Sequence, residues 1–208
     1  MTAKIKLNAA SGGGSFSLQA PSSSANTRVM TLPDTPDGTL LTTTNPKTGN
    51  VIQVVSQTKT DVTTISTSAD TFYNYDDASL KVTITPSSAS SKIFLIGNIA
   101  CSSNTNVGAM FVRFNKDGSA LSGAIGDASG SRGRMTTAAI QHSNSYPTFH
   151  SLSFLDTAGD TNSRYYNFGI AQNAGSGRNV KINDHYTTAD NFGNGLFIST
   201  ITVMEIAA

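Results

Sequence analysis

Apolar and polar residues alternate along most of the chain after residue 50, at the period of a β-strand. Leu80, Val82 and Ile84 alternate with polar residues as far as Pro86, which predicts a half-buried strand ending there. The short run at 93–96 is continuously apolar, which is typical of a strand covered on both faces. Further strands are predicted at 51–55, 58–71, 110–114, 152–154, 166–170, 180–182 and 196–206.

The segment 196–206 predicts a strand tied into a sheet, because its apolar residues divide between two faces. One face carries Ile198, Met204 and Ile206, and the other carries Phe197, Ile201 and Val203. Upstream, Lys116-Asp117-Gly118 predicts a hairpin turn. No amphipathic helix of three turns can be placed. About eight short strands joined by Gly, Asn, Ser and Asp predict an all-β, antiparallel sandwich or jelly-roll head over 51–208.

Residues 1–50 differ from the rest of the chain in composition: they contain few large apolar residues and many Gly, Ser, Thr and Pro. Short alternating pieces separated by turn signals predict a β stem or attachment arm. This segment has too few large apolar side chains to build a hydrophobic core by itself. We therefore expect its apolar side chains to be buried in a trimer or attachment interface formed by Phe16, Leu18, Met30 and Leu32. The alternative is that the segment wraps onto its own head domain.

Composition narrows the class of protein. Charged residues make up 13% of the 208 residues, against roughly 25% in ordinary soluble domains. The net charge of +1 gives no general attraction to nucleic acid. Cys101 is the single cysteine, so it is expected to be a small buried residue. The first residues lack the apolar stretch of a signal peptide, and no run approaches a membrane span of roughly 20 residues. We expect a protein made in a cytoplasm, without membrane insertion.

No recognisable catalytic, metal or nucleotide motif occurs. His142, His150 and His185 stand apart, outside the usual zinc-ligand spacings. The Gly-rich run at 11–15 lacks the Gly-Lys-Ser/Thr ending of a phosphate-binding loop. Carboxylates at 76–77, and at 156 with 160, lack the calcium-loop pattern. We expect no enzymatic activity, no cofactor and no bound metal.

The N-terminal stretch contains three distinctive sequence motifs: GGGSFSLQAP at 12–21, NTRVMTLP at 26–33 and DGTL at 37–40. It resembles a β module of tail-fibre-like virion appendage proteins of phages, particularly those of marine bacteria. The resemblance extends downstream through 51–55, 82–88, 91–93 and 199–206. It implies a homotrimeric fibre with an N-terminal β stem and a compact β head. Fibres of this class are often much longer, whereas this chain holds one copy of the module.

The leading interpretation is a structural virion protein, made in a bacterial host, that forms a homotrimeric tail fibre or tip and contacts a host receptor. Its expected partners are its own copies, other virion proteins and a host surface glycan or protein. Receptor-facing loops are expected at Asp117, Arg132, Arg134, Tyr146 and Arg178, although these residues are equally suited to packing or trimer contacts.

Three alternatives remain open at this stage. A capsid decoration, cementing or head-fibre protein would bind neighbouring capsomers through the N-terminal arm. A carbohydrate-binding, lectin-like module would bind glycans without belonging to a virion. A glycan-degrading spike enzyme normally needs paired acidic residues on a long β-helix, and here Glu205 falls at a buried position of the last strand.

Overall fold

The computed structural model describes residues 4–19, 22–25, 27, 29, 46–105, 108–144, 146–173, 178–187 and 189–208. The chain forms two compact units, Met1–Leu40 and Leu41–Ala208. In the described part of the chain the regular structure is β-strand, apart from two short 3-10 helices. The predicted all-β class is confirmed. Met30 and Leu32 of the predicted interface lie outside the described residues.

The first unit contains an antiparallel hairpin made of β1 (Lys4–Asn8) and β2 (Ser15–Gln19). Its turn uses the glycine run expected there, since Gly12 and Gly13 have φ of 84° and 71°. Ala9 N donates to Gly14 O at 2.8 Å and closes the loop. A two-stranded hairpin of this kind is only marginally stable by itself in water.

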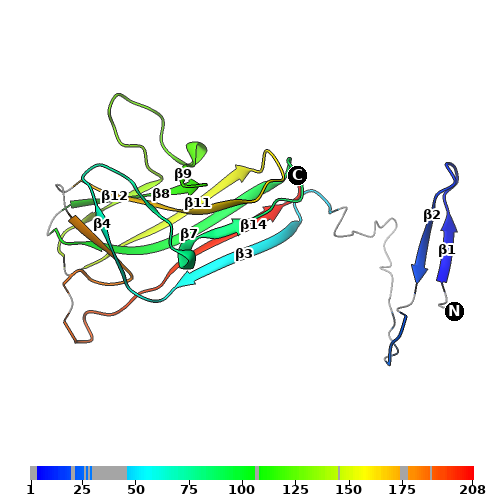
Figure 1. The fold of residues 1–208 in the computed structure, drawn as a ribbon, viewed down its shortest axis with the longest axis horizontal. Coiled ribbons are helices and arrows are strands. Elements are labelled where there is room, and N and C mark those ends of the chain that lie inside the picture. Colours follow the sequence, from blue (N-terminus) through cyan, green and yellow to red (C-terminus); the bar gives the residue numbers. More distant parts are fainter. Residues whose placement is uncertain are drawn as a thin grey trace. The chain divides into compact units, whose positions relative to one another are not determined.

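The second unit is the head, drawn from cyan to red in Figure 1. Its strands are β3 (Val51–Lys59), β4 (Thr63–Thr67), β5 (Tyr73–Tyr75), β6 (Val82–Ile84), β7 (Lys92–Ser103), β8 (Gly108–Lys116), β9 (Ser119–Ala120), β10 (Thr137–Gln141), β11 (Thr148–Thr157), β12 (Arg164–Gln172), β13 (Arg178–Ile182) and β14 (Ser199–Ile206). The 3-10 helices are η1 (Ala78–Leu80) and η2 (Ser122–Ala124).

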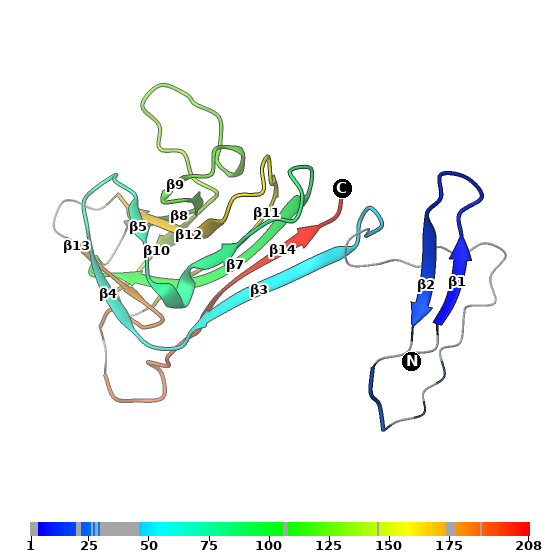
Figure 2. The same cartoon turned by 45° about the vertical axis from the view of Figure 1, so that its right-hand side comes forward.

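These strands form two sheets that pack face to face as an antiparallel sandwich of the jelly-roll kind (Figure 2). The first sheet has the order β3-β14-β7-β13-β4, and β11 pairs with most of β7 on the side away from β14. The second sheet has the order β10-β8-β12-β5, with β6 on β12 and β9 on β8. Successive strands such as β7 and β8, or β11 and β12, belong to different sheets.

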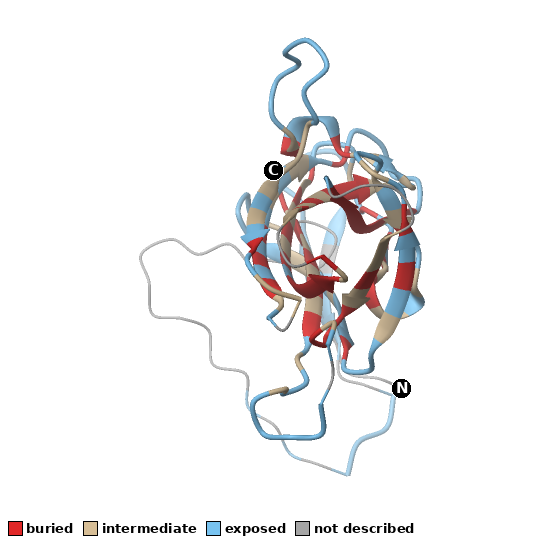
Figure 3. Cartoon of the chain, turned by 90° about the vertical axis from the view of Figure 1, so that its left-hand side faces the viewer, coloured by how far each residue is buried: buried red, intermediate tan, exposed pale blue. Residues whose placement is uncertain are grey.

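The core lies between the two sheets, where the buried residues of Figure 3 gather. Inward side chains alternate along each strand: Ile93 and Leu95 of β7 face Phe114 and Phe168 of the second sheet. The two Phe rings stack with centroids 5.8 Å apart. They press closely on the first sheet at Gly97, where a Cβ atom would lie 2.7 Å from a Phe168 ring carbon.

We predict that Gly97→Ala lowers the free energy of unfolding by about 1–3 kcal/mol, because overpacking forces the Phe168 ring or the strand to move. Urea denaturation followed by fluorescence measures the change. Gly126→Ala is the control, since a Cβ there meets no atom within 4 Å. Equal denaturation midpoints for the two variants would contradict the close approach at Gly97.

Three local predictions need correction. The long stretch at 58–71 is divided between β3 and β4, with a break after Lys59. Leu80 ends the helix η1 and does not begin a strand, because Asp77 accepts a hydrogen bond from Ser79 N and starts a helical turn. The run 93–96 is covered within the protomer on one face only, since Ile93 and Leu95 are buried whereas Phe94 and Ile96 are half-buried.

Candidate assembly surface

The outward face of the first sheet carries a continuous row of apolar side chains. Met204 of β14 lies opposite Val54 of β3 on one side and Phe94 of β7 on the other. Leu155 of β11 continues the row opposite Phe94. Val54 and Leu155 are exposed over 55% and 51% of their surface. These four residues cross four neighbouring strands of the sheet, and within the protomer they face away from the core.

The rest of this face is almost free of charge. We define the assembly face as the outward positions of β3, β14, β7 and β11, all of them in the described part of the chain: Val54, Ser56, Thr58, Thr200, Thr202, Met204, Ile206, Lys92, Phe94, Ile96, Asn98, Ala100, Phe149, Ser151, Ser153, Leu155 and Thr157. Of these positions Lys92 alone is charged, and it donates to Thr157 Oγ1 at 2.9 Å. Loss of charge with retained apolar side chains is typical of the centre of a protein interface.

An aromatic cluster extends the assembly face at one end of the sandwich. The Phe149 ring meets Phe197 edge-on, with centroids 5.1 Å apart. Phe197 and Tyr146 in turn contact the ring of His185, at 5.3 Å and 6.1 Å. Tyr146 and Phe149 are both more than 60% exposed, and so is Ile198, which follows Phe197 in sequence. Tyr146, predicted to face a receptor, therefore adjoins the assembly face.

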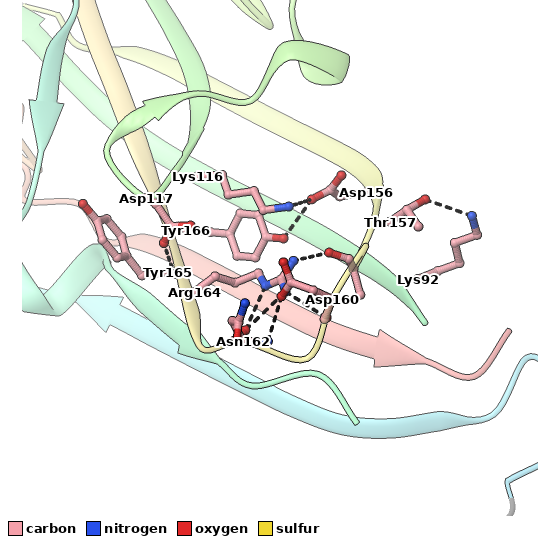
Figure 4. A network of polar contacts seen from close by, with 11 residues as sticks. Lys92, Lys116, Asp117, Asp156, Thr157, Asp160, Asn162, Arg164, Tyr165 and Tyr166 are labelled. Atoms are coloured by element: carbon pink, nitrogen blue, oxygen red, sulfur yellow. Dashed lines mark hydrogen bonds and ion pairs between the residues drawn. The ribbon is translucent and has the colours of Figure 1, made fainter. Parts of the chain in front are cut away.

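A network of hydrogen bonds and ion pairs links side chains at the end of the sandwich opposite the aromatic cluster (Figure 4). The Asp156 carboxylate accepts from Lys116 Nζ at 3.0 Å and from the Tyr166 hydroxyl at 2.9 Å. Asp117 has φ of 49° in the turn predicted from sequence, and its carboxylate accepts from Tyr165 N at 2.9 Å. The bond of Asp117 ties the turn to β12.

The other predicted receptor residues do not join Asp117. Arg132 and Arg134 lie in the 126–136 connection, where Arg134 Nε donates to Gly126 O at 2.6 Å and closes the loop. Arg178 begins β13, and its carbonyl accepts from Thr67 Oγ1 at 3.0 Å. Arg132 and Arg134 thus share one loop, whereas Asp117, Tyr146 and Arg178 lie in other parts of the fold, and Asp117 lies at the end of β8 away from the Tyr146 end.

The hairpin of the first unit also presents uncovered apolar residues. Leu18 is 42% exposed, and Ile5 opposite it is 64% exposed. Leu7, 58% exposed, lies opposite position 16, which is Phe16. The alternation of a strand puts these register positions on one face of the hairpin.

One buried cluster combines residue types that occur in catalytic sites. Thr148 Oγ1 lies 3.0 Å from His150 Nε2 and donates to the carbonyl of Cys101 at 3.0 Å. Burial raises the pKa of the Cys101 thiol to about 12 and lowers the pKa of His150 to about 4. Cys101 is fully buried, as its sequence context predicted. The thiol is therefore protonated and shielded from solvent, which suits a packing role.

A buried lysine forms ion pairs at the edge of the sandwich. Lys59 is 1% exposed, and its ammonium group donates to Asp61 at 2.8 Å and to Asp77 at 3.3 Å. Asp77 also accepts from Ser79 N and Oγ at 2.8 Å and 2.7 Å, and from the Tyr75 hydroxyl at 3.1 Å. The bonds from Ser79, together with those from Lys59 and Tyr75, lower the pKa of Asp77 below its ordinary value.

We predict that the head loses stability as the pH falls below about 4, the ordinary pKa of an aspartate. A carboxyl whose folded pKa is depressed stabilises the fold above its unfolded pKa, and that contribution is lost as it is protonated. Asp77→Asn is expected to melt lower than wild type at pH 7 and to lose less on acidification. Thermal melts from pH 7 to pH 3 measure both effects, with the exposed Asp127→Asn as control. Parallel wild-type and Asp77→Asn profiles would contradict the prediction.

The described residues show neither a metal site nor a membrane-spanning helix. No group of three His, Cys, Asp or Glu side chains is placed to hold a metal ion. Within the same ranges, no helix has the length and apolarity to cross a bilayer.

The assembly face was not predicted from sequence. The signal that indicates it is the second apolar set of each strand, such as Phe94 and Ile96 or Met204 and Ile206, which lies opposite the core-facing set and is only half-buried. Only the register of four strands shows that these sets form one surface.

Comparisons with known proteins leave the family open. No family model matches the chain, and no curated protein matches it. Among solved structures, the chain is similar to one in the "Structure of infectious bursal disease virus Gx strain", at 11% identity and a TM-score of 0.30. The match covers 94% of this chain and 43% of that chain. A TM-score of this size does not indicate a shared fold.

Proposed function

We propose that the chain is a non-enzymatic structural subunit of a virus particle and assembles as a homotrimer. The observation that carries the proposal is the apolar row of Val54, Met204, Phe94 and Leu155 on the assembly face. A contiguous apolar patch on the outward face of a sheet is often an interaction site. A second copy of the chain is the partner we propose for it.

The size of the surface supports a contact between subunits. Four strands spaced about 4.8 Å apart, each about nine residues long, present roughly 500 Å². A stable interface buries roughly 800 Å² on each partner, so the assembly face supplies most of this area. The aromatic cluster around Phe149 and Phe197 adds to it. Lys92 is the single charged position of the assembly face and lies at its edge, so two copies of the chain would repel each other only weakly there.

The N-terminal unit supports a cyclic arrangement. Symmetry about a single axis makes the three N-terminal units equivalent and brings them to the same end of the axis. There their exposed residues Ile5, Leu7 and Leu18 would be covered by neighbouring copies. The resemblance of 12–40 to phage fibre modules supports a place in the virion, as a tail fibre or tip with the head turned towards a host receptor.

Native mass spectrometry of the full-length protein tests the assembly. We expect a mass three times that of the 21.7 kDa chain, unchanged on dilution through the micromolar range. A mass equal to one chain at all concentrations would overturn the proposal, and twice that mass would overturn the threefold symmetry.

A further inference from the structure

A pocket on the second sheet has the chemistry of a sugar-binding site. It has a volume of about 380 Å³, within the range of roughly 300–1,000 Å³ typical of small-molecule sites. Its apolar part is formed by Phe72, Phe111 and Met135, and its polar part by Asp70, Ser131 and Asn173. Ser131 and Met135 belong to the long connection that follows η2.

The apolar part is held in place by the sheet. Phe111 on β8 lies opposite Ala171 on β12, and both residues line the pocket. The Phe72 ring lies against the guanidinium of Arg113, whose central carbon is 4.0 Å from the ring centroid. Arg113 Nε donates to Asn115 Oδ1 at 3.1 Å. The ring of Phe72, held against Arg113, and the ring of Phe111, carried by a central strand of the sheet, offer an apolar surface for a ligand.

The polar part of the pocket offers a ligand one hydrogen-bond acceptor, the carboxylate of Asp70, and one donor, the side-chain amide of Asn173. Asn173 Oδ1 accepts from Ala109 N at 2.9 Å, so the Nδ2 side of the amide remains available to donate. Asp70 is held through its backbone, because its N donates to Gln172 O at 2.9 Å. Its carboxylate is exposed and makes no hydrogen bond or ion pair with the described residues. A ligand in the pocket would thus meet a carboxylate and an amide N–H beside the two rings.

We infer that this pocket binds a neutral sugar ring. One face of a pyranose carries C–H groups that pack on an aromatic ring, and its hydroxyls both donate and accept hydrogen bonds. Asp70 would accept from a hydroxyl, and Asn173 would donate to one. A neutral sugar is favoured over a sugar acid, whose carboxylate would lie near Asp70, because Arg113 contacts the Phe72 ring but does not line the pocket.

The inference deepens the proposed function, because it names a glycan as the receptor and rests on the head being exposed on a particle. Its site is on the second sheet, whereas the assembly face is on the first. Arg132 and Arg134, predicted to face a receptor, flank the residues of the loop that line this pocket.

Saturation-transfer difference NMR on the full-length protein tests the inference. The probes are the methyl pyranosides of glucose, galactose, mannose and N-acetylglucosamine, with methyl glucuronide as the acidic comparison. We expect at least one neutral probe to bind, more strongly than the glucuronide. Phe111→Ala and Asp70→Asn are each expected to weaken that binding about tenfold, the effect of losing a ring contact or a charge-assisted hydrogen bond.

Phe192→Ala is the matched control, because Phe192 is fully exposed and does not line the pocket. Asp70→Asn keeps the shape of the side chain, so it remains informative if Phe111→Ala fails to fold. Binding by none of the neutral probes, or equal binding by wild type and Asp70→Asn, would overturn the inference. The native mass of the same samples separates the two proposals: trimers that bind no sugar overturn only the pocket, and monomers that bind overturn only the assembly.

Discussion

Leu155→Glu should convert the proposed trimer to monomers at micromolar concentration. In the trimer the new carboxylate would be buried against a neighbouring copy, where Lys92 is the single cation of the assembly face and already bonds Thr157. An unpaired charge in an interface costs several kcal/mol, which is a factor of 10³ or more in the association constant. The fold of the protomer should survive, because the Leu155 side chain is 51% exposed within it. Size-exclusion chromatography with light scattering measures the mass.

The control is Thr83→Glu, which places the same charge at an exposed position of β6 in the second sheet. This variant should keep the wild-type mass, and both variants should keep the wild-type circular dichroism. A trimeric Leu155→Glu protein with an intact fold would show that the interface lies elsewhere.

Amide hydrogen exchange in the N-terminal hairpin should be slowed about a hundredfold in the assembled protein. An isolated two-stranded hairpin gives its amides little protection, so any protection of 4–19 must come from a surface that covers Ile5, Leu7 and Leu18. Burying such side chains contributes roughly 1.5–3 kcal/mol each, and opening against that free energy limits exchange. Ile5→Asp combined with Leu7→Asp should abolish the protection. Exchange followed by mass spectrometry on the full-length protein measures it.

Lys6→Asp is the matched control, because Lys6 lies between these residues and points to the other face of β1. It introduces the same carboxylate and should leave protection unchanged. If neighbouring copies provide the cover, the monomeric Leu155→Glu variant should also lose it. Protection that persists in monomers would mean that the hairpin is covered within its own chain.

Alternation predicted the strands of the head well, because burial against one core imposes a period of two. Ile201 and Val203 face the core and Met204 faces outward, as the pattern of the last strand indicates. Glu205 is buried as predicted. The pattern did not show that Ser87 and Gln53, far away in sequence, donate to its carboxylate at 2.6–2.7 Å. Such bonds depend on which strands become neighbours.

The proposed sites were harder to predict for the same reason. The assembly face combines positions from β3 to β14, and the pocket joins Asp70 to Asn173 through an isolated parallel bridge between Ala69 and Gln172. Neither set is contiguous, so no local motif marks it. The carboxylate of Asp117, a residue predicted to face a receptor, accepts a hydrogen bond from Tyr165 N. Turn chemistry indicated the conformation there but not the partner.

The position of β14 has a consequence for biosynthesis. β14 lies between β3 and β7, so the first strand of the head cannot join its sheet until 199–206 have emerged from the ribosome. Until then β3 has no partner strand and β7 leaves one edge unpaired, and both carry apolar side chains, which favours association between nascent chains. Pairing across more than 140 residues, as between Val54 and Met204, is also slow. The sheet that carries the assembly face can therefore be completed only late in synthesis, after the other strands of the head have been made.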